Sequence, residues 1–318
     1  MLGAAFWLAL TIAATRCQGQ PDLSNLPNIK VPTLGGGQFW TDHFLHGDWR
    51  IQRNALSGKY RLLDPWNLQV ASGTYEACWE AFHQAEASGK VEPLTETVVI
   101  LLHGLGRTRH SMSKLARHLH EKTEWTAMRM EYASTQGKVA AHSAALRHII
   151  ARMKGPKTIH LVGHSLGNIV IRHYLRATDQ RGRERRVDPR IGRIVMLAPP
   201  NRGAAMARLL KDAKVFQWIA GKAGQELAEQ TEDFAARLGR PRQPFAIIAG
   251  NVLTSKGGNP LIPGPDDLVV GVDEARLEGA TEFRVVSAAH TWIMNKPEVQ
   301  TAVLQFLKTG SMEEKRGR

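Results

Sequence analysis

The sequence has few cysteines and no long apolar run, and each shortage excludes a class of protein. Two cysteines, Cys17 and Cys78, occur among 318 residues, too few for a small secreted scaffold held by several disulfide bonds. No run of about 18 apolar residues lies within the body of the chain, so no membrane-spanning helix is expected there. No internal repeat is visible, which argues against stacked repeat architectures.

Patterns that bind metals or nucleic acids are missing as well. The 13 histidines include no His-Glu-x-x-His motif, and the chain has no closely spaced cysteine pair. No helix-turn-helix, zinc-finger or RNP-like pattern occurs. We therefore expect no metal, no cofactor and no nucleic-acid partner.

Positive charge is the marked bias of the composition. The net charge is +13, whereas the hydrophobic (43%) and charged (22%) fractions are ordinary for a globular protein. The basic residues are scattered, and the densest cluster comprises Arg181, Arg183, Arg185, Arg186, Arg190 and Arg193. Because Gly182 and Pro189 interrupt it, this cluster indicates a solvated loop. A patch that binds anions, such as an anionic membrane surface, is the alternative.

The N-terminus carries a candidate targeting signal. Residues 2–14 (LGAAFWLALTIAA) are apolar, have the length of a secretory h-region and are short for a membrane span. Gly19 offers a small residue for cleavage, although no Lys or Arg precedes the apolar run. We expect a signal over residues 1–19 and export to the periplasm or the cell exterior. A retained anchor, or a misassigned start and a cytoplasmic protein, are the alternatives.

The next two segments differ in composition. Residues 20–38 are rich in Pro, Asn and Gly, which is typical of a linker. Within an N-terminal extension over residues 39–92, two strand-like runs at Trp49–Arg53 and Lys59–Leu63 predict a β-hairpin. A helix is predicted over Glu76–Ala87, after the capping segment Ser-Gly-Thr. The pattern of this extension indicates no chemistry.

From Thr97 onward, strand-like runs alternate with helical stretches. TVVILL at Thr97–Leu102 is the kind of continuous apolar run that a buried parallel strand requires. Further strands are predicted at Ala127–Tyr132, Ile159–Val162, Arg193–Leu197, Phe245–Ala249 and Phe283–Ser287. Helices are predicted at Met112–Lys122, Val139–Met153, Ile169–Ala177, Ala204–Leu210 and Pro297–Leu307. This alternation predicts an α/β fold with a mostly parallel sheet and helices on both faces, over residues 93–310. A basic tail follows at 311–318.

A Gly-x-Ser-x-Gly motif stands between one of these strands and the next helix. The strand over Ile159–Val162 leads directly into Gly163-His164-Ser165-Leu166-Gly167. Such a tight strand-to-helix turn leaves no room for side chains at the glycine positions and raises the serine hydroxyl above the sheet edge. The amides at the start of the helix then face developing negative charge. The motif therefore predicts that Ser165 is a nucleophile; an ordinary buried serine is the alternative.

Five segments together resemble bacterial lipases and esterases of the α/β-hydrolase superfamily, especially triacylglycerol-lipase-like and GPI-inositol-deacylase-like proteins. The resemblance covers about residues 97–309, and the segments are HGLG, GHSLGN, LAPPNRG, PDDLVVGVDEARL and AAHTWIMNKPEVQTAVLQFL. It implies an α/β-hydrolase fold, with a cap at about residues 201–240. In that cap, Val215, Phe216, Trp218 and Ile219 are candidates for lining an acyl pocket.

The resemblance also implies the remaining site residues. The family order of nucleophile, acid and base falls on Ser165, Asp267 and His290, and the oxyanion-hole amides fall on Leu105 and Leu166. The family pattern D-x-[VI]-V matches Asp-Leu-Val-Val and so favours Asp267, while its neighbour Asp266 stays an alternative. One departure is that Thr-Trp follows the histidine where a small residue is usual. His103 and His164 are expected to serve in packing.

These residues predict a serine-dependent carboxylic ester hydrolase that works through an acyl-enzyme. We expect an ester substrate with an apolar acyl group, and an anionic membrane surface is a candidate partner. An acyltransferase or amidase with the same triad is the first alternative. A non-catalytic binding module is the second, and the intact set of Ser, Asp and His argues against it. The sequence indicates no oligomeric state.

Overall fold

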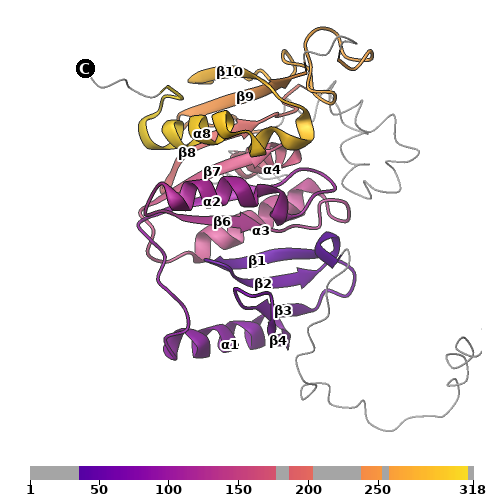
Figure 1. The fold of residues 1–318 in the computed structure, drawn as a ribbon. Helices are drawn as coiled ribbons and strands as arrows, with labels where there is room; N and C mark the ends of the chain where they lie inside the picture. Colours follow the sequence, from indigo (N-terminus) through magenta and orange to yellow (C-terminus); the bar gives the residue numbers. More distant parts are fainter. Residues whose placement is uncertain (1–35, 177–185, 203–237, 253–257, 314–318) are drawn as a thin grey trace, which may run out of the picture.

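The computed structural model describes residues 36–176, 186–202, 238–252 and 258–313. The predicted signal segment and most of the predicted linker, cap and basic tail lie outside these ranges. Among the described residues, an antiparallel sheet comes first and a parallel sheet with helices on both faces follows it (Figure 1). No helix in these ranges is long and apolar enough to span a membrane.

The antiparallel sheet has four strands within the described residues, in the order β1-β2-β3-β4. They are β1 (Trp40–His46), β2 (Trp49–Asn54), β3 (Tyr60–Leu63) and β4 (Gln69–Gly73), and a short 3-10 helix, η2 (Gly36–Phe39), precedes them. The predicted hairpin is confirmed as β2 and β3. β1 and β4, which pair on either side of that hairpin, were not predicted.

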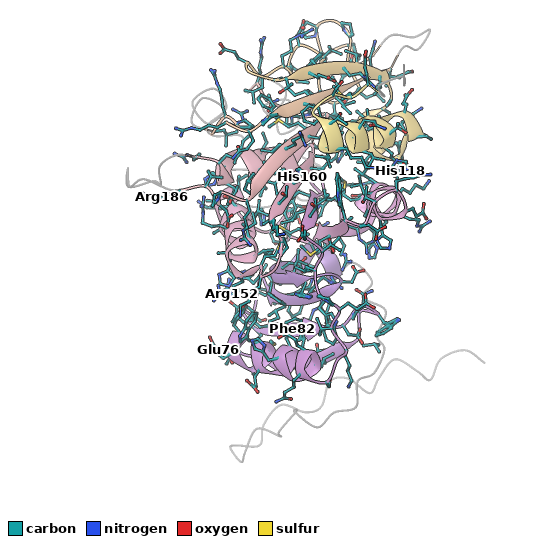
Figure 2. All side chains as sticks on the ribbon, turned by 90° about the vertical axis from the view of Figure 1, so that its left-hand side faces the viewer. Glu76, Phe82, His118, Arg152, His160 and Arg186 are labelled. Atoms are coloured by element: carbon teal, nitrogen blue, oxygen red, sulfur yellow. The ribbon has the colours of Figure 1, made fainter. Side chains whose placement is uncertain are left out.

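Helix α1 (Tyr75–Ala87) covers one face of this sheet. It begins after Thr74, whose hydroxyl accepts a hydrogen bond from the Ala77 amide at 3.2 Å, as an N-cap residue does. Figure 2 shows Phe82 on the inner side of the helix, where it packs with residues of the strands, and Glu76 on the outer side. Cys78 is also buried there as a free thiol.

The parallel sheet has six strands within the described ranges, in the order β6-β5-β7-β8-β9-β10, and all neighbours are parallel. The strands are β5 (Thr97–Leu102), β6 (Thr126–Met130), β7 (Thr158–His164), β8 (Ile191–Leu197), β9 (Phe245–Asn251) and β10 (Glu282–Ser287). The order shows that the chain starts inside the sheet, with β5, and crosses to β6 before it returns. The predicted parallel α/β sheet is confirmed.

Helices cover both faces of the parallel sheet (Figure 1). They are α2 (Ser113–Glu121), α3 (Val139–Arg152), α4 (Leu166–Tyr174) and α8 (Pro297–Thr309), with the 3-10 helices η3 (Arg109–Met112) and η4 (His290–Asn295). Alternate residues of β5 serve opposite faces: Val98 and Ile100 pack with α3 and α4, whereas Val99 and Leu101 pack with α2 and α8. Because both faces are buried, β5 must be apolar throughout.

The two sheets meet at β1 and β6. The Asp42 amide donates to the Glu131 carbonyl at 2.9 Å, and the Glu131 amide donates back to the Asp42 carboxylate at 2.6 Å. One step further, the Ala133 amide donates to the Thr41 hydroxyl at 3.1 Å. These bonds join the antiparallel sheet to the β6 edge of the parallel sheet, although the two remain separate sheets, and Figure 1 shows β1 beside β6.

Two arginines of the predicted basic cluster are used inside the fold. Arg190 donates to the carbonyls of Ile150 and Met153 at the end of α3, and Arg193 donates to the Leu307 carbonyl in the last turn of α8. Cations at helix C-termini satisfy free carbonyls and complement the helix dipole. The cluster's Arg181, Arg183 and Arg185 lie outside the described residues.

Candidate active site

Ser165 stands in the turn between β7 and α4, at the carboxyl edge of the parallel sheet. Its backbone has φ +50° and ψ −117°, which is rare for a residue with a side chain. The Ser165 amide donates to the Leu197 carbonyl at the end of β8 at 3.0 Å, which helps to hold this conformation. A strained serine at this edge is the arrangement that the Gly-x-Ser-x-Gly motif predicts.

The glycines of the motif are required by close backbone contacts. A Cβ atom on Gly163 would lie 2.8 Å from the Asn168 amide nitrogen, and one on Gly167 would lie 2.6 Å from the Leu102 carbonyl oxygen. Backbone atoms in a buried turn cannot move away easily, so neither position has room for alanine. Local sterics therefore explain both glycines.

The structure brings Asp267 and His290 into direct contact. The His290 Nδ1 atom lies 2.8 Å from the Asp267 Oδ2 atom, and both side chains are buried. The other carboxylate oxygen accepts hydrogen bonds from the amides of Val269 at 3.0 Å and Val270 at 2.7 Å. A carboxylate against Nδ1 places the ring proton on that atom, which leaves Nε2 free to accept a proton.

Asp266 has different partners. Its carboxylate accepts hydrogen bonds from the Leu268 amide at 2.7 Å and the Asn259 amide at 3.0 Å. These bonds close the loop in which it lies, and the side chain makes no bond to His290 among the described residues. Of the two adjacent carboxylates, Asp267, which the sequence pattern favoured, is the one that contacts the histidine.

His164 links the serine turn to the histidine loop. It precedes Ser165, and its Nε2 atom donates to the His290 carbonyl at 2.9 Å. Burial and the nearby His290 lower the pKa of His164 well below its ordinary value, so its ring is neutral. Ser165, Asp267 and His290 thus lie at one sheet edge. Within the described part of the chain, no hydrogen bond joins the Ser165 hydroxyl to the His290 ring.

The loop after β5 passes directly beside Ser165. A Cβ atom on Gly104 would lie 3.2 Å from the Ser165 Cβ atom. The Leu166 amide opens α4, so helix geometry leaves it without an intrahelical acceptor. The Leu105 amide donates no hydrogen bond to the residues that the structure describes. Neither amide therefore has an acceptor among the described residues.

Gln38, the last residue of the predicted linker, holds this loop. The Gln38 side-chain amide donates to the Arg107 carbonyl at 2.6 Å, and its oxygen accepts from the Ser134 hydroxyl at 3.3 Å. The Ser134 hydroxyl in turn accepts from the Gly106 amide at 3.1 Å. Gln38 was not predicted as a site residue, because it lies 69 residues before Arg107 and belongs to no motif.

His103 packs beneath the same loop. Its Nδ1 atom bonds the Gly104 carbonyl at 2.8 Å, and its ring stacks on Tyr132 with centroids 4.1 Å apart. Its Nε2 atom lies 3.2 Å from a Glu131 carboxylate oxygen. Both ring nitrogens are thus engaged with the protein, which fits the predicted packing role.

Other predicted features can be placed only in part. The residues expected to line an acyl pocket, Val215, Phe216, Trp218 and Ile219, lie outside the described residues. In the ranges that the structure covers, no group of three or more His, Cys, Asp or Glu side chains could hold a metal ion.

The comparison with known proteins identifies the family. Residues 44–302 match the model of the alpha/beta hydrolase family, which is well over half of the chain. The chain therefore belongs to this family, and it is a hydrolase of the α/β-hydrolase type. The narrower resemblance to GPI-inositol-deacylase-like enzymes stays a prediction. No curated protein matches the chain.

Solved structures with a similar fold include proteins described as lipases and esterases. A lipase-esterase related protein from Clostridium acetobutylicum is 12% identical, with 67% of this chain and 94% of that chain covered and a TM-score of 0.43. A lipase from Bacillus licheniformis in its propeptide form is 19% identical, with 69% and 52% covered and a TM-score of 0.47. An esterase from Pyrococcus furiosus is 14% identical, with 86% and 93% covered and a TM-score of 0.47.

Proposed function

We propose that this chain is a serine-dependent carboxylic ester hydrolase that works through an acyl-enzyme. One observation carries the proposal: a buried hydrogen bond between Asp267 and His290 lies at the sheet edge where Ser165 occupies its strained turn. A histidine that is oriented by a carboxylate and lies at the same sheet edge as a serine is the arrangement that activates a serine hydroxyl.

In the first half of the cycle, the Ser165 oxygen attacks the ester carbonyl and forms a new carbon–oxygen bond. The serine proton passes to Nε2 of His290, and the carbonyl electrons become an oxyanion that the Leu105 and Leu166 amides bind. Collapse of this intermediate breaks the bond to the alcohol, which takes the proton from His290. Two such amides contribute several kcal/mol to the transition state.

In the second half, water attacks the acyl-serine ester. His290 accepts one proton from the water and returns it to the Ser165 oxygen as the acid departs, so the enzyme is regenerated. Asp267 stays ionised throughout, because its role is to hold the ring orientation and to stabilise the imidazolium. The missing hydroxyl-to-ring hydrogen bond is compatible with this cycle, since such bonds often tighten only when substrate is bound.

Apolar side chains beside the acid support an acyl group as part of the substrate. Leu268, which follows Asp267, is 46% exposed, and Leu261 in the preceding loop is 59% exposed. The Asn259 side chain donates to the Leu268 carbonyl at 3.1 Å and accepts from the Leu261 amide at 3.0 Å, so it joins the two segments. Each methylene of the acyl chain that these side chains cover would contribute about 0.8 kcal/mol to the binding free energy of the substrate.

The test is Ser165→Ala, assayed on p-nitrophenyl esters from acetate to palmitate and with a fluorophosphonate probe. We expect the wild type to hydrolyse at least one ester and to be labelled, and the variant to lose about a thousandfold or more in rate and all labelling. Ser72→Ala, at an exposed position on β4, is the matched control. A Ser165→Ala variant that keeps its activity within about tenfold would refute the proposal.

A further inference from the structure

Arg107 and Trp292 form a pair between the two loops that flank the candidate active site. Arg107 lies two residues after Leu105, and Trp292 lies two residues after His290. The guanidinium carbon of Arg107 is 5.3 Å from the centre of the Trp292 ring, within the range of a cation–π contact. This contact joins the loop that carries an oxyanion amide to the loop that carries the base.

Arg107 has no acidic partner among the residues that the structure describes. Other arginines near the sheet edges do: Arg109 and Arg129 both pair with Asp48, and Arg190 pairs with Asp188. Arg107 is half-buried, and no carboxylate of the described residues neutralises its charge. A group of that kind binds an incoming anion more strongly than a fully solvated cation would.

The backbone of Arg107 is already fixed. Its carbonyl accepts from the Gln38 side chain at 2.6 Å, and its amide donates to the Gly104 carbonyl at 3.2 Å. Burial and the nearby His290 lower the pKa of His164 most, and the positive charge of Arg107 lowers it further. The Arg107 charge therefore acts on the turn that carries Ser165. Arg107 is therefore a cation whose backbone is held in the loop that passes beside Ser165.

We propose that Arg107, braced by Trp292, is an anion subsite that selects esters with a carboxylate or phosphate group near the scissile bond. The proposal rests on the ester hydrolase function and deepens it. The planar guanidinium can bind two oxygens of either group at once, and the aromatic ring holds its plane. Trp292 is 57% exposed and borders solvent, so a substrate can reach the pair. Trp292 stands near the position after His290 where the family usually has a small residue, and its proposed role is to hold the Arg107 guanidinium.

The experiment compares matched neutral and anionic esters. One pair is p-nitrophenyl methyl adipate and p-nitrophenyl hydrogen adipate; the other is monooctanoyl glycerol and its 3-phosphate. The measured quantity is the ratio of kcat/KM for the anionic ester to that for the neutral one. Arg107→Gln is expected to lower this ratio at least tenfold, and Arg107→Lys to lower it less, since lysine lacks the paired donors. Added salt should lower the wild-type ratio.

Arg117→Gln is the matched control, because Arg117 is an exposed arginine on α2. It should leave the ratio as in the wild type. A drop confined to the phosphate pair would support the subsite and identify a lipid phosphate as its ligand; a drop confined to the adipate pair would identify a carboxylate.

An unchanged ratio in Arg107→Gln for both pairs, or an equal drop in Arg117→Gln, would overturn the subsite while leaving the ester hydrolase intact. A folded wild type that hydrolyses none of the four esters and takes no fluorophosphonate would instead overturn the hydrolase proposal itself.

Discussion

Replacing Asp42 by asparagine should change how the stability of the protein depends on pH. Asp42 is fully buried where β1 meets β6. Burial raises the pKa of its carboxyl from 3.8 to about 6, and the cations Arg50 and Arg109 and hydrogen bonds from Glu131 and Gln52 offset only part of that rise. The folded protein therefore holds this proton more tightly than the unfolded chain does.

The sign and size of the effect follow from that difference. A raised pKa contributes stability that is fully present below the unfolded value, about pH 4, and that is lost as the pH rises through about 6. The difference between 3.8 and about 6 corresponds to about 3 kcal/mol at 1.36 kcal/mol per pKa unit. Asparagine does not titrate, so the variant lacks this dependence.

The assay is urea unfolding of the wild type and Asp42→Asn, followed by tryptophan fluorescence between about pH 4 and pH 7. The stability of the wild type relative to the variant should fall by about 3 kcal/mol over that range, or roughly 1 M in midpoint at a slope of about 3 kcal/mol/M. Asp273→Asn, at an exposed position, should follow the wild type. A constant difference between wild type and Asp42→Asn would refute the reasoning.

Three further predictions concern the candidate site. Asp267→Asn should lower kcat/KM about a thousandfold or more, because the histidine loses its orienting charge, whereas Asp266→Asn should mainly lower stability; the reverse ranking in ester assays would make Asp266 the acid. Gln38→Ala should lower kcat about tenfold with little change in KM, because it loosens the loop of the Leu105 amide, and exposed Gln84→Ala should not; equal kinetics would remove that role. Gly163→Ala should cost about 1–3 kcal/mol in urea unfolding, and a wild-type midpoint would contradict the turn geometry.

The parallel sheet and the serine turn could be predicted because their causes are local. β5 has the bounds that its apolar run predicts, Thr97–Leu102, since a strand buried on both faces needs an unbroken run. The motif around Ser165 is just as local, because its glycines avoid clashes with backbone atoms of the same turn and of the neighbouring strand. Features that depend on short-range sterics and burial can therefore be recognised in the sequence.

Other parts of the structure left no such pattern. β4 is exposed except at Ala71 and ends in glycine, and β1 has a bulge between Asp42 and Phe44, so neither shows clean alternation. The resemblance favoured Asp267 over Asp266, but only their hydrogen bonds show which carboxylate contacts His290. Gln38 acts on residues far along the chain, where spacing carries no signal.

The junction of β1 and β6 bears on where this chain can be cut. Composition changes near residue 93, which looks like a natural starting point for a shorter protein. A fragment that began there would uncover the β6 edge of the parallel sheet, beside which β1 lies, and exposed strand edges invite association with other chains. It would also lack both the Asp42 contacts to Glu131 and the Gln38 brace on the loop beside Ser165. β1 thus covers the outer edge of the hydrolase domain. A shortened protein should therefore lose no residue beyond 35, so that η2 and β1 are kept.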